Sequence, residues 1–186
     1  SEEGYAGGIM GFGIGMVLKN CVNLGDIQTL NENTGAGGIA GSGADIFENC
    51  VNAGNVSGGD SVAVGGIVGT PINWTYHKTA LKDCYNFGVL SSDDLYHVGN
   101  IVGNLESTYW GASNSATNCR YVTDFGYVEN DPLGIPVSLA ELCALGMHTP
   151  NDQMSSASND VESWENYDEY SLPMPTTLAM IDDVKV

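Results

Sequence analysis

Cysteines and histidines are the side chains of this chain that most often do chemistry, as nucleophiles, disulfide partners or metal ligands. The 186 residues include five cysteines and three histidines. His77, His97 and His148 lie in unrelated contexts, and the sequence contains neither a His-Glu-x-x-His zinc pattern nor a Gly-x-Ser-x-Gly nucleophile turn. We therefore expect no catalytic residue, no metal ligand set and no cofactor.

Four of the cysteines recur at similar intervals, at Cys21, Cys50, Cys84 and Cys119. If each occupies the same place in successive layers of a structure, neighbouring side chains lie roughly 4.8 Å apart. A disulfide needs Cβ atoms about 3.5 to 4.5 Å apart and a twisted dihedral, which parallel stacking resists. We therefore expect a ladder of buried free thiols, with Cys143 in a different environment.

Cys21, Cys50 and Cys84 begin a repeated phrase, Cys-x-Asn-x-Gly-x-aliphatic, and the version at Cys119 has lost both the Asn and the Gly. A second phrase of glycines precedes each of the four cysteines. The first phrase contains Asn23, Asn52 and Asn86 and then Gly25, Gly54 and Gly88. The second phrase occurs at 7–11, 37–41, 65–69 and 99–103, with Asn100 in place of the second glycine of the last copy. Periods of 20 to 50 residues are typical of solenoids, propellers and arrays.

Short β-branched runs with period-two alternation, such as Val62, Val64 and Ile67, indicate strands. We predict an all-β chain, a parallel β-solenoid of about four coils with one coil per repeat. A propeller ranks lower because each blade needs several strands. The residues expected inside the coils are Ile9, Ile39, Ile67 and Ile101, the four cysteines, and Ile27, Val56 and Leu90.

The asparagines and glycines of the cysteine phrase are expected at a corner of each coil. Gly25, Gly54 and Gly88 would take positive φ there, which glycine reaches without steric cost. The asparagines two residues earlier would bond side chain to side chain between coils.

Together the two phrases, Gly-Gly-Ile-x-Gly and Asn-Cys-x-Asn-x-Gly-x-Val, resemble the GLUG motif repeat of bacterial surface proteins. The resemblance covers roughly residues 7–128 and is strongest in the second and third copies. Such repeats occur in some IgA-specific metallopeptidases and in adhesin-like proteins, outside the protease part. The resemblance implies an extracellular, non-catalytic module at the bacterial cell surface.

Insertions fall between the glycine phrase and the cysteine in the third and fourth copies only. They contain Trp74, Tyr76, Tyr109 and Trp110. Loops inserted on one face of a repeat array are often its binding face. The aromatic rings would either bind a glycan or host protein or pack the loops onto the flank of the coil.

Residues 129–186 depart from the repeat and are expected to cap residues 1–128. Ser138-Leu139-Ala140-Glu141 is a capping-box pattern that predicts one short helix. Leu139, Leu142 and Cys143 are expected to face the end of the solenoid.

The net charge is −18, with five Lys and Arg against 23 Asp and Glu, which argues against nucleic acid and anionic membranes as partners. No apolar run approaches the roughly 20 residues of a membrane helix. We expect a monomeric part of a larger chain, with further repeats or a cap upstream that would cover the first coil.

One enzyme class stays open, because polysaccharide lyases and hydrolases also use parallel β-helices. Those sites need clustered carboxylates, often with calcium or a cationic base. The candidates are Asp83 and Asp93-Asp94, with Arg120 and Asp124 as an ion pair. A carbohydrate-active enzyme is therefore the alternative to a surface scaffold or adhesin-like module.

Overall fold

The computed structural model describes residues 4–30, 34–43, 46–72, 78–93, 97–105, 114–129, 131–144, 164–167 and 172–175. The chain divides into two compact units, Ser1–Pro136 and Val137–Val186. Residues 129–136, expected to begin the cap, thus belong to the same compact unit as the repeats. Within the described ranges, no helix has the length and apolarity needed to cross a membrane.

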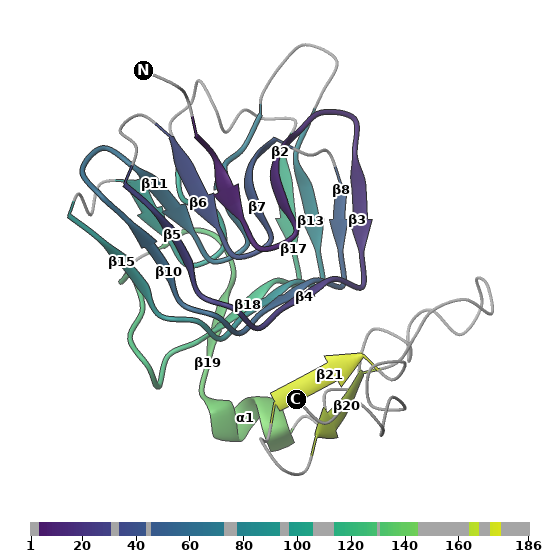
Figure 1. Ribbon diagram of the computed structural model, residues 1–186. Coiled ribbons are helices and arrows are strands. Elements are labelled where there is room, and N and C mark those ends of the chain that lie inside the picture. Colours follow the sequence, from purple (N-terminus) through teal and green to yellow (C-terminus); the bar gives the residue numbers. More distant parts are fainter. Residues whose placement is uncertain are drawn as a thin grey trace. The chain divides into compact units, whose positions relative to one another are not determined.

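The first unit is a stack of coils, each made of up to five short strands (Figure 1). The first coil contains β1 (Ala6–Gly7), β2 (Met10–Gly13), β3 (Val17–Lys19), β4 (Val22–Asn23) and β5 (Ile27–Thr29). The second contains β6 (Gly35–Gly37), β7 (Ala40–Gly43), β8 (Ile46–Glu48), β9 (Val51–Asn52) and β10 (Val56–Gly58). The third contains β11 (Ala63–Gly65), β12 (Val68–Thr70), β13 (Ala80–Lys82), β14 (Tyr85–Asn86) and β15 (Leu90–Ser92). The fourth contains β16 (Val98–Gly99), β17 (Ser115–Thr117) and β18 (Arg120–Val122).

Corresponding strands of successive coils pair in parallel and without slippage, so the stack consists of long parallel sheets. Ala36 of β6, for example, lies between Ala6 and Val64, and Val56 of β10 lies between Ile27 and Leu90. In the fourth coil the position equivalent to β12 forms no full strand, and Val102 makes an isolated parallel bridge to Val68 there. The predicted parallel β-solenoid with one coil per repeat is therefore confirmed.

The interior is largely apolar, and each equivalent position contributes one residue from each coil. Ile39, Ile67 and Ile101 are fully buried and pack in one cluster with the cysteines and with Phe47. Ile9 was expected to be the first member of this stack, but its side chain is 48% exposed. The difference arises because a coil's interior is covered from both sides by its neighbours, and the first coil here has a neighbour on one side only.

The asparagines of the cysteine phrase form a continuous hydrogen-bonded ladder inside the stack. Asn23 Nδ2 donates to Asn52 Oδ1 and Asn52 Nδ2 donates to Asn86 Oδ1, both at 2.9 Å. Each amide also donates to the carbonyl two residues later, at 2.7, 2.8 and 3.2 Å. Tyr121 occupies the next position in the fourth coil. The ladder satisfies polar groups that burial would otherwise leave unpaired.

Gly25, Gly54 and Gly88 follow these asparagines, but their φ angles are not positive. The prediction that these positions need glycine for a positive φ was therefore wrong. Glycine is needed there because the backbones of adjacent coils approach closely. A Cβ on Gly54 would lie 2.0 Å from the Gly25 carbonyl oxygen, and one on Gly88 would lie 1.9 Å from that of Gly54. The backbones of adjacent coils touch here, so there is no room for a side chain.

The left-handed corner is instead formed by the residue that precedes each cysteine. Asn20, Asn49, Asp83 and Asn118 have φ of 54°, 57°, 54° and 53°. Asparagine and aspartate tolerate this region better than other residues with a Cβ. Their side chains also bond between coils, with Asn49 Nδ2 donating to Asn20 Oδ1 at 2.8 Å and Asn118 Nδ2 donating to Asp83 Oδ1.

The last coil is closed by residues 128–135 of the same unit. Asn100 donates from Nδ2 to the Val128 carbonyl and accepts from the Val128 N–H at Oδ1, both at 2.8 Å. Its own N–H donates to Asp131 Oδ2. Leu133 packs against the main apolar cluster, and Ile135 N–H donates to the Cys119 carbonyl at 2.8 Å.

The second unit begins within β19 (Ile135–Val137) and contains α1 (Leu139–Ala144) and a hairpin of β20 (Trp164–Tyr167) and β21 (Leu172–Pro175). The predicted capping box is present, with Ser138 N–H donating to Glu141 Oε2 at 2.8 Å and Glu141 N–H donating to Ser138 Oγ at 3.1 Å. These hydrogen bonds lower the pKa of Glu141. Leu142 is buried, and the capping role of this unit stays a prediction.

Replacing Asn52 with alanine should destabilise the solenoid more than replacing Asn23. The Asn52 side chain is bonded to the asparagines on both sides, so its loss leaves buried polar groups unpaired on two coils, at a cost of about 3 kcal/mol. Asn23→Ala breaks the end of the ladder and should cost about 1 kcal/mol. Chemical denaturation followed by circular dichroism measures both, and equal losses would contradict the ladder.

Gly54→Ala should cost about 2 kcal/mol or more, because its Cβ would overlap the Gly25 carbonyl. Gly54→Asn separates this explanation from a conformational one. At a left-handed position asparagine would be tolerated better than alanine, whereas at a contact position it should be at least as harmful. Thermal unfolding of the two variants gives the ranking.

Candidate functional site

The aromatic residues proposed as a ligand surface, Trp74, Tyr76, Tyr109 and Trp110, lie outside the described residues. The stems of the two insertions that carry them are described. One insertion joins β12 to β13 and the other joins the Val102 bridge to β17, so both connect the same pair of sheets in adjacent coils.

Thr79 links the two stems. Its hydroxyl is 3.3 Å from both the N–H and the carbonyl of Ile72, at the other end of the first insertion. Its N–H donates to Asn114 Oδ1 at 2.8 Å, and its carbonyl accepts from Ser115 N–H at 3.0 Å, at the end of the second insertion. Thr79 is fully buried. The two insertions therefore leave the solenoid from adjoining positions on a common hydrogen-bonded base.

Sequence reasoning missed Thr79. The available signal was the position of Thr79 immediately before β13, where a hydroxyl can replace a backbone partner that the insertion removes from the ladder.

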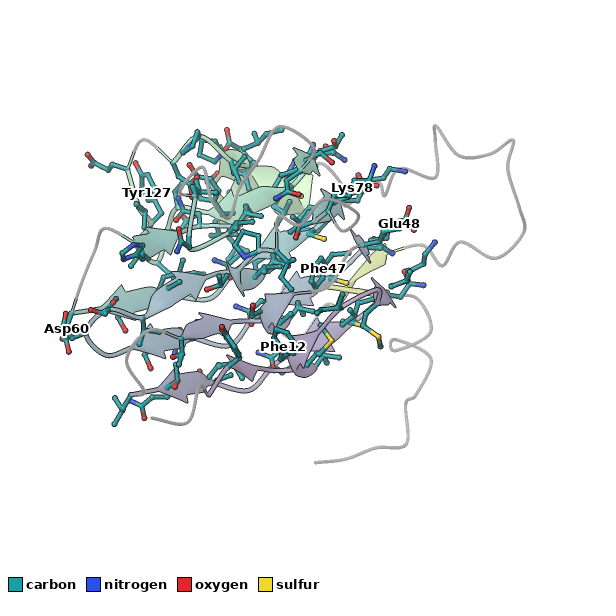
Figure 2. All side chains as sticks on the ribbon, turned by 90° about the horizontal axis from the view of Figure 1, so that it is seen from above. Phe12, Phe47, Glu48, Asp60, Lys78 and Tyr127 are labelled. Carbon is teal, nitrogen blue, oxygen red and sulfur yellow. The ribbon has the colours of Figure 1, made fainter. Side chains whose placement is uncertain are left out.

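The described basic residues gather on the same side of the stack as the stems. Lys19, Glu48 and Lys82 occupy corresponding positions in β3, β8 and β13, and Lys19 Nζ lies 2.5 Å from Glu48 Oε2. Lys78 directly precedes this sheet. Figure 2 shows Lys78 and Glu48 on one side of the stack and Asp60 at the opposite tip. In a chain of net charge −18 with only five Lys and Arg, three described lysines thus lie in or next to one sheet.

Two of the residues named for the enzyme alternative, Asp83 and Arg120, have structural partners, and Asp93 is exposed. Asp83 is 5% exposed, belongs to the left-handed corner, and lies 3.7 Å from Lys82 Nζ. Arg120 lies over the Tyr85 ring, 5.9 Å from its centroid, and donates to the Tyr85 hydroxyl and the Asn118 carbonyl, both at 3.4 Å. Asp94 lies outside the described residues. In the described part of the chain, no three His, Cys, Asp or Glu side chains are grouped to hold a metal ion.

The four repeat cysteines are free thiols, and three of them are buried while Cys21 is partly exposed. Cys21, Cys50, Cys84 and Cys119 each contact the carbonyl of the residue two positions earlier, at 3.4 to 3.5 Å. Burial, together with hydrogen bonds to Cys119 and Cys50, raises the pKa of Cys84 well above its usual value. Cys50, Cys84 and Cys119 belong to the main apolar cluster, where a buried thiol behaves as a small apolar group.

Comparisons with known proteins support the fold. No protein-family model matches this chain, and no curated protein matches it. A solved structure is similar, the crystal structure of "a putative immunoglobulin A1 protease from Bacteroides ovatus", with a TM-score of 0.59 and 21% sequence identity. The match covers 93% of this chain and 53% of that chain, so this chain spans about half of its length. At this identity the likeness shows a shared fold.

Native-state alkylation should label Cys21 first, and Cys50, Cys84 and Cys119 should react only when the coils open. The reason is that a thiol must be accessible to react, and these three thiols are buried. In denaturant without reductant, all five cysteines should be labelled, as counted by mass spectrometry. Labelling of only one or three would show that a disulfide has formed.

Proposed function

We propose that this chain is a non-catalytic display module of an extracellular bacterial protein. The stacked coils serve as a scaffold, and the two aromatic insertions form its recognition element for a glycan or a host protein. The observation that carries this proposal is the shared base of the insertions, where Thr79 is bonded to Ile72, Asn114 and Ser115.

The shared base matters because recognition needs side chains held at a constant spacing. The stems continue parallel sheets whose coils are joined by backbone hydrogen bonds and by two side-chain ladders. Loops on such a base lose less conformational entropy on binding than loops on separate elements. Two Trp and two Tyr residues provide flat apolar faces that suit sugar rings as well as protein side chains.

The extracellular assignment draws on the resemblance to GLUG repeats, on the strongly acidic surface, and on the fold shared with a Bacteroides protein described as a putative immunoglobulin A1 protease. The non-catalytic assignment draws on the structural roles of Asp83 and Arg120, two of the residues named for the enzyme alternative.

Binding to a broad glycan array and to mucosal glycoproteins should be compared for the native chain and a Trp74→Ala/Trp110→Ala variant. We expect specific binding that the double variant weakens about tenfold, since stacking on an aromatic ring contributes about 0.5 to 1.5 kcal/mol and two rings are removed. Phe125→Ala is the matched control, because Phe125 is a 50% exposed aromatic ring in the fourth coil, away from the insertions.

Equal binding by the native chain and the double variant would refute the aromatic insertions as the recognition element. Shortening or eliminative cleavage of a bound glycan would refute the non-catalytic assignment and establish the carbohydrate-active alternative. No binding by the native chain would reduce the proposal to the scaffold alone.

A further inference from the structure

Two glycine positions of the repeat lie against neighbouring coils, one on each side. The second glycine of the glycine phrase lies against the following coil. A Cβ on Gly8, Gly38 or Gly66 would lie 2.5, 2.3 or 2.1 Å from the carbonyl oxygen of the corresponding residue one coil later. Glycine is therefore required at this position wherever another coil follows.

The fourth coil carries Asn100 at this position, and no coil follows it within the described unit. Its side chain occupies the space that a following coil would fill and bonds to the Val128 backbone instead. The residue type at this position thus agrees with the structure in all four copies.

The glycine of the cysteine phrase lies against the preceding coil. Gly54 and Gly88 are required because a Cβ would overlap the carbonyl of the glycine one coil earlier, at 2.0 and 1.9 Å. Gly25 occupies the same position in the first coil, where a Cβ would come no closer than 3.8 Å to another described atom, Asn23 Oδ1, which is an ordinary contact. Nothing in the described structure requires Gly25 to be glycine, although glycine there costs conformational entropy on folding.

The face of the first coil on this side is also unfinished. Each of β1, β2, β3, β4 and β5 is the edge strand of its sheet. Ile9 and Phe12 are 48% and 52% exposed, whereas the residues at the corresponding positions of the second coil, Ile39 and Ser42, are buried. Figure 2 shows Phe12 at one end of the stack and Phe47 within it. Such an open row of strands with apolar side chains is covered in stable repeat proteins.

From these observations we infer that this face is an interface for a further coil of the same repeat, stacked in parallel and in register. The new coil would place a glycine carbonyl against Gly25, as Gly25 does against Gly54. Its asparagine would donate to Asn23 Oδ1, which here accepts a hydrogen bond from the Gly25 N–H. Asn86 Oδ1 shows the completed arrangement, with bonds from both Gly88 N–H and Asn52 Nδ2.

A second copy of the chain does not fit this face equally well. Parallel, in-register stacking requires the opposite face of a coil, and in a second copy residues 128–135 already cover that face through Asn100, Leu133 and Ile135. Two first coils placed face to face would run antiparallel and would not set a glycine carbonyl against Gly25.

The test joins a copy of residues 34–61 directly in front of residue 4, which continues the observed register of Ala6 with Ala36. A scrambled copy of the same residues controls for length. We expect the added coil to raise the midpoint of thermal unfolding by several degrees, on the order of 4 °C. The Val22 and Leu24 amides should become protected from hydrogen exchange, because the corresponding Val51 and Ala53 amides donate to the preceding coil.

Gly25→Ala provides the specific readout. In the chain without the added coil it should leave the unfolding midpoint within about 1 °C, because its Cβ meets nothing closer than 3.8 Å. In the extended chain it should cancel the gain and the new amide protection, as a steric contact predicts. The same effect of Gly25→Ala in both chains, or an extended chain no more stable than the scrambled control, would overturn the inference. If the native chain forms a dimer and its Gly25→Ala variant does not, the face would be assigned to a second copy instead.

Discussion

Every feature of the solenoid depends on the distance between adjacent parallel strands, about 4.8 Å, which hydrogen bonding imposes on neighbouring coils. At this spacing a side chain meets its own counterpart in the next coil. Where backbones approach most closely, as at Gly54 and Gly25, no side chain fits, and glycine is the only solution. Where side chains point inwards, equivalent residues of successive coils stack on one another, as Ile39, Ile67 and Ile101 do.

Stacking of identical residues makes buried polar groups acceptable because an amide is both donor and acceptor. Asn52 donates to the coil on one side and accepts from the coil on the other, so a row of asparagines satisfies itself. A thiol is a weak donor and needs fewer partners, and Cys50 and Cys84 contact backbone carbonyls and neighbouring cysteines within the apolar core. Both ladders lose partners only at their ends, which is why the first and last coils differ most from the middle ones.

The same constraint decides where variation is allowed. Segments that form the sheets cannot change length without losing register, whereas the connection before β13 and β17 lies outside the pairing. The insertions with Trp74 and Trp110 occur at this connection, and Thr79 and Asn114 repair the hydrogen bonding beneath them. A rigid stack with freedom at one corner is an arrangement suited to displaying binding residues, and here that corner also carries the described lysines.

The sequence by itself determined the architecture, because a repeat of glycine, cysteine and asparagine at constant spacing has few solutions other than stacked parallel coils. It also indicated the asparagine ladder, the free thiols and the capping box at Ser138, all of which depend on local pattern or on the identity of equivalent residues. Only the tertiary structure decided which residue turns the corner, since Asn20 and Gly25 are both compatible with it in isolation. The same holds for the exposure of Ile9 and for the joining of the insertion stems by Thr79. These features depend on contacts between residues that are distant in the chain, and the spacing of residues within one repeat does not contain them.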